Sequence, residues 1–340
     1  MALAAGTRGF TPPAAGRGMR YWLGFLPAFW AEDDDVVIVD DVDVARTCAA
    51  PFLQWLPKVS FVTLNHIRTL SKEKPLGDMD VWGWDAAVRW QLVKAGVMKE
   101  CDMPDDAMVE RIRKFSHREA SIPVLCLLVE NKDFTIGERY CLHTMDEVCA
   151  YLEKKHRVVV KAPWSCSGRG MRYLCGDLSE PDAGFVANII RQQGAIIVEP
   201  WYDKVQDFAL EFTADGQGGI IYEGLSVFDT SNGAYTGNLL LPEEQKLQLL
   251  ASYIEPEKLS AVKNQLLTIL AREIVHVYAG PLGVDMMVVR SERCNLLHPC
   301  VEINLRRTMG YVALSVAHRT NHQFRSMRIV PGSQYHLLLE

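Results

Sequence analysis

The sequence predicts a mixed fold with α/β and α+β parts, and three observations support this. Short apolar runs alternate with amphipathic helices over residues 36–115, which is typical of a small α/β domain. An apolar strand over residues 158–161 leads directly into a loop rich in serine and glycine. Two neighbouring apolar runs between Gly283 and Gly310 read as strands joined by a turn.

The composition narrows the classes of function. The 340 residues suffice for two or three domains, and the net charge of −6 argues against general binding of nucleic acids or anionic membranes. Nine cysteines without a C-x-x-C motif suit reduced thiols. There is neither a signal peptide nor an apolar run of membrane-spanning length. We therefore expect a cytoplasmic protein with no nucleic-acid or membrane partner, whose oligomeric state the sequence does not indicate.

The first part of the chain, residues 1–115, predicts the small α/β domain. Strands are expected at residues 36–39 and 59–64, and helices at residues 42–48, 84–95 and 105–115. Gly96 is the expected C-cap of the second helix. A nucleotide-binding domain normally opens with a strand, and none precedes Met1. We therefore expect the native or ancestral start to lie upstream.

The middle of the chain contains a candidate phosphate loop. Thr144 is the expected N-cap of a helix over residues 145–154, and a strand over residues 158–161 then ends at Lys161. The following residues, APWSCSGRGM, offer backbone N–H groups and hydroxyls without bulky side chains. The stretch is neither a Walker A loop nor a G-x-G-x-x-G fingerprint. The composition of this loop suits the binding of a polyphosphate. The alternative interpretation of the same residues is an ordinary β-turn.

A helix over residues 185–192 and further strands follow this loop. Strands are predicted over residues 195–199, 207–212 and 220–228, and the last leads into a small polar loop, residues 230–238. In the second strand Asp207 and Glu211 face away from Phe208, Leu210 and Phe212. For Glu211 the alternative is a solvated strand face. Long helices are expected over residues 256–278 and 311–319.

The stretch from Gly283 to Gly310 contains a candidate metal site. Glu302 and Asn304 lie two residues apart on one strand, so they point to the same side, and Asp285 on the other strand can face Glu302. Two carboxylates and an amide oxygen suit Mg²⁺. Arg306 and Arg307 follow at once, and guanidinium groups suit phosphate or carboxylate. The alternative is an exposed hairpin with solvated acids.

The arrangement Asp285…Glu302-x-Asn304-x-Arg306 resembles the C-terminal signature of ATP-grasp enzymes. The resemblance implies that Asp285, Glu302 and Asn304 hold the Mg²⁺ ions, with Mn²⁺ as a substitute, that bridge the ATP phosphates. It places Arg306 near the transferred phosphate or the substrate. Together with the strand lysine Lys161, Arg306 is the expected catalytic residue.

The other landmarks of this family appear upstream in the family order. Arg118, before the segment SIPVL, resembles the basic residue at the α-phosphate, although it can equally be a surface arginine at a helix end. The resemblance implies that Glu199 lies at the adenine hinge and that Asp207 binds the ribose hydroxyls. The remaining nucleotide contacts that it implies are the loop residues and the apolar walls of the adenine site: Lys161, Ser165, Ser167, Gly168, Gly170, Trp201 and Tyr202.

The polar loop over residues 230–238 resembles the substrate-side loop of some ATP-grasp ligases. It supplies most of the candidate substrate contacts, and Arg307 completes them: Asn232, Tyr235, Thr236, Asn238 and Arg307. A purely structural loop is the alternative for each of the loop residues.

The resemblance covers about residues 115–320 and implies an ATP-grasp fold, in which two α+β subdomains sandwich ATP behind a small domain that is incomplete at its N-terminus. The expected boundaries are residues 1–115, 116–197 and 198–340. The implied activity is a ligase that joins a small-molecule or peptide carboxylate to an amine or thiol through an acyl phosphate. A phosphotransferase or a non-catalytic ATP-binding module is the alternative.

Overall fold

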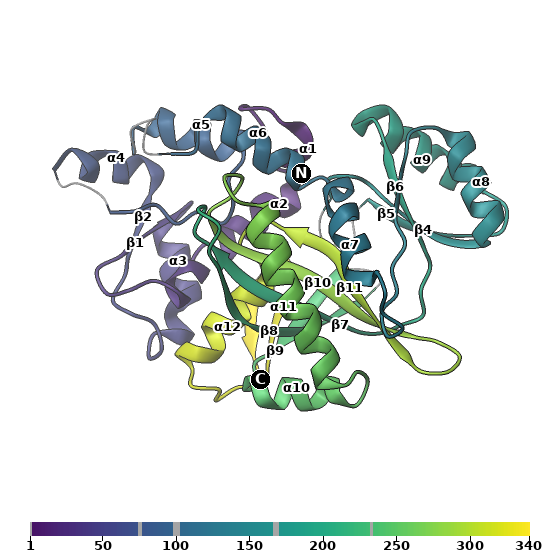
Figure 1. Cartoon of the computed structure of the whole chain (residues 1–340). Coiled ribbons are helices and arrows are strands. Elements are labelled where there is room, and N and C mark those ends of the chain that lie inside the picture. Colours follow the sequence, from purple (N-terminus) through teal and green to yellow (C-terminus); the bar gives the residue numbers. More distant parts are fainter. Residues whose placement is uncertain (1, 74–76, 98–102, 166–169, 232–233) are drawn as a thin grey trace.

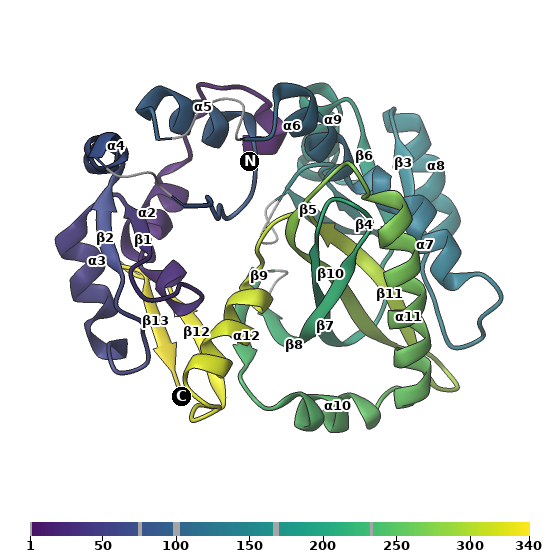
Figure 2. The ribbon, with the colours of Figure 1, turned by 60° about the vertical axis from the view of Figure 1, so that its left-hand side comes forward.

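The computed structural model describes residues 2–73, 77–97, 103–165, 170–231 and 234–340. Three sheets organise these residues, with two, four and seven strands. Figures 1 and 2 show the N-terminal third of the chain on one side, the four-stranded sheet on the other, and the seven-stranded sheet between them. The predicted combination of α/β and α+β parts is confirmed.

The N-terminal part is built around two parallel strands, β1 (Val36–Val39) and β2 (Ser60–Thr63). The predicted C-cap Gly96 ends α5 with φ 64°, and Asp105 accepts a hydrogen bond as the N-cap of α6. The helices of this part are α1 (Ala2–Ala5), α2 (Ala14–Trp22), η1 (Leu26–Phe29), α3 (Val42–Ala49), η2 (Ala50–Phe52), α4 (Leu64–Glu73), α5 (Ala86–Ala95) and α6 (Asp106–Phe115).

The four-stranded sheet is antiparallel in the order β3 (Tyr140–Leu142), β6 (Ile196–Pro200), β4 (Arg157–Lys161) and β5 (Met171–Cys175). Helices α8 (Met145–Lys155) and α9 (Glu180–Gln193) cover one face and share its core. Thr144 and Glu147 form the capping box of α8. Helix α9 begins earlier than expected, because Ser179 caps it and Pro181 occupies its first turn.

The seven-stranded sheet has the order β11 (Asn295–Asn304), β10 (Gly280–Arg290), β7 (Lys204–Ala214), β8 (Ile220–Ser231), β9 (Ala234–Leu239), β12 (Ser326–Val330) and β13 (His336–Leu339). Its largest core lies against α7 (Ile122–Val129) and α11 (Pro256–Glu273). α10 (Glu243–Ala251) and α12 (Met309–Arg319) also pack on β8. The predicted helix over residues 256–278 ends at Glu273, earlier than expected.

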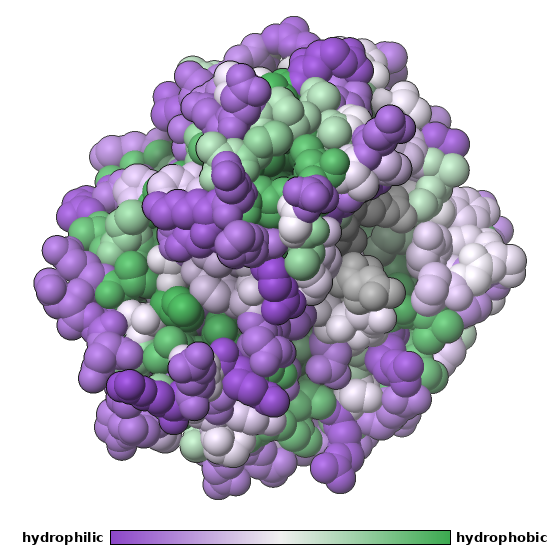
Figure 3. Space-filling view, turned by 90° about the vertical axis from the view of Figure 1, so that its right-hand side faces the viewer, coloured by the Kyte–Doolittle hydropathy of each residue, from purple (hydrophilic) through white to green (hydrophobic). Residues whose placement is uncertain are grey.

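The two ends of the chain share a core. Side chains of η1, β1 and α3 pack with those of α12, β12 and β13. The N-terminal part is thereby fixed to the end of the large sheet. The face beside α8 and α9 is largely hydrophilic, with small hydrophobic areas between the polar residues (Figure 3). Among the described helices none is both long and apolar enough to cross a membrane.

Candidate active site

One cavity of about 2100 Å³ lies between the N-terminal part, the four-stranded sheet and the seven-stranded sheet. Most of the candidate residues line it, although they come from segments far apart in the sequence. The candidates on its wall are Arg118, Lys161, Ser165, Glu199, Trp201, Tyr202, Asp207, Tyr235, Asp285, Glu302, Asn304 and Arg306.

The two acids of the candidate metal site face each other across the β10–β11 pair. Asp285 and Glu302 are direct register partners, so the prediction that they oppose each other is confirmed. Asn304 is buried, and its Nδ2 donates to Asp285 Oδ2 over 3.1 Å. Removal from water, followed by the charge of Glu302, raises the pKa of Asp285 to about 7. Both acids are only partly exposed, and Asp285 is bonded to Asn304 and Glu302 to Arg118, so the alternative of solvated acids on an exposed hairpin is wrong.

Two arginines contact these groups. Arg118 is buried, and its guanidinium donates to Glu302 Oε2 over 2.9 Å and to Ser165 Oγ over 2.8 Å. It is not a surface arginine, so that alternative is wrong. Arg306 donates to Asn304 Oδ1 over 3.0 Å and to the carbonyl of Arg307 over 3.1 Å. Both guanidinium groups thus lie beside the acid pair.

The donor set fits Mg²⁺ in its chemistry. Asp285 and Glu302 supply carboxylate oxygens next to each other, and the Asn304 amide supplies a third hard oxygen. Within the described part of the chain, no three His, Cys, Asp or Glu side chains gather as a metal cluster. A cation here would therefore use these two acids, the amide and oxygens of a bound phosphate or water.

A buried ion-pair network lies at the end of β4. Lys161 Nζ donates to Glu199 Oε2 over 2.6 Å, and Arg139 Nε donates to Glu199 Oε1 over 2.5 Å. Burial alone raises the pKa of Glu199, but Arg139 and Lys161 lower it below its usual range. Burial lowers the pKa of Lys161, against the opposing effect of Glu199. Two cations share one anion, which leaves a net positive charge beside the cavity.

The predicted adenine walls are half-buried side chains on the cavity wall. Trp201 lies 4.8 Å from the Tyr173 ring and 4.2 Å from the Arg157 guanidinium. The N–H of Trp201 donates to the carbonyl of Arg157 over 3.0 Å, so this backbone group is already engaged within the sheet. Both carboxylate oxygens of Glu199 are already engaged by cations. Any contact of Glu199 with an adenine amine would share one of these oxygens.

The ends of the glycine-rich loop are close together. Gly170 has φ 83°, its carbonyl accepts from the N–H of Ala162 over 2.7 Å, and a Cβ there would lie 3.1 Å from the side chain of Ser165. This positive φ explains the glycine. Gly170 does not itself line the cavity. Ser167 and Gly168 lie outside the described residues.

Asp207 lies on β7, at the cavity wall, and is held by two neighbours. Its Oδ2 accepts from Thr230 Oγ1 over 2.7 Å and is also paired with Lys204 Nζ. Both contacts are made by the same carboxylate oxygen. Its proposed contact with a ribose remains a prediction.

Residues 230–238 do not form the expected loop. β8 extends to Ser231 and β9 begins at Ala234, so most of the stretch pairs within the sheet. Asn238 is buried and donates to Ser226 Oγ over 2.7 Å, because β9 lies between β8 and β12. Thr236 Oγ1 donates to the carbonyl of Asp229. Tyr235 reaches the cavity, these other two do not, and Asn232 lies outside the described residues.

Arg307 does not line the cavity. Its guanidinium is buried between the rings of Trp30 and Tyr311, at 4.3 Å and 4.6 Å, and pairs with Asp80 over 2.7 Å. The free structure therefore places this candidate substrate contact in an ion pair with the N-terminal part. Successive residues after a strand point to different sides, and only Arg306 faces the cavity.

Sequence reasoning missed the burial of two ionisable side chains, Arg139 and Glu211. Arg139 precedes β3 in a segment without periodicity, and its partners come from distant strands, so no local signal revealed it. Glu211 was expected to point to the same side of its strand as Asp207, with a solvated strand face as the alternative. That alternative is wrong, because the exposed fraction of Glu211 is 0%. Burial raises the pKa of Glu211 to about 8, and one carboxyl oxygen has no hydrogen-bond partner among the described residues.

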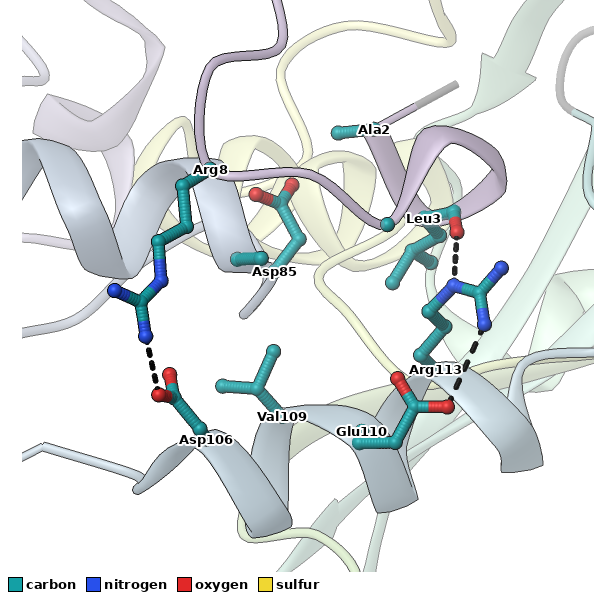
Figure 4. A pocket seen from close by; sticks show the side chains of 10 residues that line it. Ala2, Leu3, Arg8, Asp85, Asp106, Val109, Glu110 and Arg113 are labelled. Carbon is teal, nitrogen blue, oxygen red and sulfur yellow. Dashed lines mark hydrogen bonds and ion pairs between the residues drawn. The ribbon is translucent and has the colours of Figure 1, made fainter.

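A second pocket of about 200 Å³ lies where α1 meets α5 and α6 (Figure 4). Its charges are largely paired: Arg8 binds Asp106 over 2.5 Å, and Arg113 binds Glu110 over 3.5 Å and the carbonyl of Leu3 over 2.6 Å. These contacts attach α1 to α6.

No protein-family model matches this sequence, and no curated protein sequence matches it. Solved structures do match. The N5-carboxyaminoimidazole synthetase of Staphylococcus aureus, complexed with ADP, is 12% identical with a TM-score of 0.53, over 92% of this chain and 80% of that chain. The biotin carboxylase of Campylobacter jejuni is 11% identical with a TM-score of 0.53, over 87% of this chain and 67% of that chain.

A third match is the biotin carboxylase domain of the 2-oxoglutarate carboxylase of Hydrogenobacter thermophilus, solved with MgADP. It is 12% identical with a TM-score of 0.50, over 88% of this chain and 66% of that chain. At these identities the likeness concerns the fold. All three are ATP-grasp enzymes, and the match extends over nearly the whole of this chain, including the N-terminal part. The chain therefore has the ATP-grasp fold.

Proposed function

We propose that this protein is an ATP-dependent ligase that joins a carboxylate to an amine or thiol through an acyl phosphate, releasing ADP and phosphate. The observation that carries the proposal is the large cavity lined by described residues. It brings the opposed acids Asp285 and Glu302 together with Lys161, Arg118 and Arg306, all from different parts of the chain. Oxygen ligands beside several fixed cations suit a polyphosphate and its metal.

The nucleotide would lie across the cavity. Trp201 and Tyr202 would hold the adenine, and Asp207 the ribose hydroxyls. Arg118 and Lys161 would contact the phosphates, together with Ser165 and the loop that Gly170 closes. Lys161 would then exchange part of its pairing with Glu199 for a phosphate oxygen, while Arg139 keeps that carboxylate neutralised.

Asp285, Glu302 and Asn304 would hold Mg²⁺, with Mn²⁺ as a substitute. The ion neutralises phosphate charge when it is bound. The residues of the chain position the reacting groups and stabilise developing charge, since phosphoryl transfer needs little covalent help from the protein. Arg306 lies beside Asn304 and would contact the transferred phosphoryl group. Glu302 would be shared between the ion and Arg118.

The reaction would run in two steps. A substrate carboxylate attacks the γ-phosphorus of ATP, the bond to the β,γ-bridging oxygen breaks, and ADP leaves. An amine or thiol then attacks the acyl carbon, loses its proton and displaces phosphate. Tyr235 is the hairpin residue best placed to meet the substrate, because it lines the cavity. The boundaries 1–115, 116–197 and 198–340 remain our proposed division of the chain.

Trapping of the acyl phosphate tests the proposal. The purified protein is incubated with MgATP, pools of carboxylic acids and hydroxylamine, and hydroxamate, ADP and phosphate are measured. A ligase forms all three in equal amounts with one of the pools, and Glu302→Ala abolishes them. ADP formation without phosphate release would instead identify a phosphotransferase. The exposed variant Glu292→Ala, in the β10–β11 turn, is the control.

A further inference from the structure

Arg307 is the centre of a contact between the N-terminal part and the end of β11. Its guanidinium NH2 donates to Asp80 Oδ2 over 2.7 Å, and the same oxygen accepts from the indole Nε1 of Trp30 over 2.9 Å. The Arg307 guanidinium also stacks on Trp30 at 4.3 Å and on Tyr311 at 4.6 Å. We call Trp30, Asp80 and Arg307 the clamp.

The segment that carries Asp80 also contacts the backbone around Arg306. The N–H of Arg307 donates to the carbonyl of Trp82 over 2.8 Å. Gly83 packs so closely on Arg306 that a Cβ at Gly83 would lie 2.8 Å from the Cβ of Arg306. Residues 80–83 thus fix the main chain on which Arg306 is mounted, and this close approach explains the glycine.

Among the described residues, two hydrogen bonds hold the side chain of Arg306. One goes to Asn304 Oδ1 and the other to the carbonyl of Arg307. The second acceptor is the backbone carbonyl of Arg307, whose side chain is bound by Trp30 and Asp80. A long arginine side chain has many rotamers, so its direction depends on the placement of this carbonyl. A displacement of about 1 Å in a group that contacts a transferred phosphoryl group can lower the reaction rate by up to about a hundredfold.

We propose that Asp80 and Trp30 are positioning residues for Arg306, and that through the clamp the N-terminal part of the chain takes part in phosphoryl transfer. This inference rests on the proposed function. Arg307 is buried and stacked on two rings, whereas the Asp80 side chain is 50% exposed, so the stacking holds this guanidinium beyond what a surface ion pair alone contributes. Trp30 and Asp80 also line the cavity, and the proposal is that they act through Arg307 rather than through contact with the nucleotide.

The test compares two binding constants for each variant. The affinity for MgADP alone reports on the nucleotide site, and the affinity for MgADP with aluminium fluoride reports on the groups that surround the transferred phosphoryl. The readout is the gain in affinity when aluminium fluoride is added to MgADP, and calorimetry measures both affinities. We expect Arg306→Ala to lose the gain. Asp80→Ala and Trp30→Phe should reduce it about tenfold and leave the affinity for MgADP within about twofold of wild type.

Two matched controls exist in the chain. Trp55→Phe also removes an indole N–H that links the N-terminal and C-terminal parts, since Trp55 Nε1 donates to Gln323 over 3.1 Å. Asp43→Ala removes an aspartate paired with an arginine on the surface of α3. Neither residue lines the cavity. Both controls should keep the full gain, and Asp80→Glu, which retains a carboxylate, should recover part of it.

The outcomes separate the two proposals. A reduced gain in Asp80→Ala and Trp30→Phe, with intact controls, supports the clamp. An intact gain in both, with loss in Arg306→Ala, overturns the clamp and leaves the proposed function standing. A wild type that gains nothing from fluoride overturns the clamp as well, since Arg306 then holds no phosphoryl group. Absence of MgADP binding by the wild type overturns the proposed function itself.

Discussion

Replacing Glu211 by glutamine should change the pH dependence of stability. The carboxyl group of Glu211 is fully buried on β7. Its Oε1 accepts from Thr308 Oγ1 over 2.8 Å, and its Oε2 has no hydrogen-bond partner among the described residues. Burial therefore favours the neutral acid and raises the pKa from 4.5 to about 8, while the bond from Thr308 opposes the rise and the charge of Asp285 adds to it.

The sign of the effect follows from proton binding. In the unfolded chain the group titrates near 4.5, so between pH 4.5 and about 8 the folded protein holds a proton that the unfolded chain has lost. The stability that this group contributes is complete below pH 4.5 and is lost as the pH rises through that interval. Each pH unit in this interval lowers the free energy of unfolding by about 1.4 kcal/mol, and the whole interval lowers it by roughly 4–5 kcal/mol as an upper limit.

The assay is urea unfolding, followed by tryptophan fluorescence at several values between about pH 5 and 8. Glutamine does not titrate, so the free energy of unfolding of Glu211→Gln should rise relative to wild type by about 1.4 kcal/mol for each pH unit. Glu292→Gln, exposed in the β10–β11 turn, should show no such trend. An equal difference between Glu211→Gln and wild type at both ends of the range would refute a protonated, buried Glu211.

Three further substitutions test individual contacts in and around the cavity. Glu199→Gln leaves Lys161 and Arg139 buried without an anion and should lower the free energy of unfolding by about 3–5 kcal/mol in urea, whereas Asp43→Asn, in an exposed pair, should have little effect. Gly283→Ala places a methyl group 2.6 Å from Glu211 Oε2 and 2.8 Å from Thr308 Cγ2 and should destabilise by about 1–3 kcal/mol; Gly184→Ala, on α9 with open space around it, should not. Asp285→Asn should abolish the strengthening of ATP-analogue binding by Mg²⁺, because the ion loses one of its two carboxylates, and calorimetry with and without Mg²⁺ would contradict this if the strengthening persisted.

Local patterns were sufficient to predict most elements and the facing acids. The two-residue spacing of Glu302 and Asn304, with Asp285 on the preceding strand, fixed which side chains share a face, and the observed register agrees. The capped helices α6 and α8 were also predictable, because Asp105 and Thr144 are local signals. Such features depend on residues close together in the sequence.

What the sequence did not reveal depends on distant partners. Arg139 meets Glu199 only because β6 and β11 come together beside it. Asn238 was assigned to a loop from its polar neighbours, but β12 pairs with it from the end of the chain. Arg307, unlike Arg306, turns away from the cavity and packs between Trp30 and Tyr311, which lie far from it or outside its strand in the sequence. Tertiary context thus overrides local composition at these positions.

Calorimetry with a non-hydrolysable ATP analogue tests the central claim most directly. Wild type and Lys154→Ala, which alters an exposed lysine of α8, should bind the analogue in a magnesium-dependent manner. Lys161→Ala should bind at least about tenfold more weakly, because it removes a buried cation from the cavity wall. Absence of binding by the wild type, or equal binding by Lys161→Ala, would contradict a nucleotide site built on Lys161.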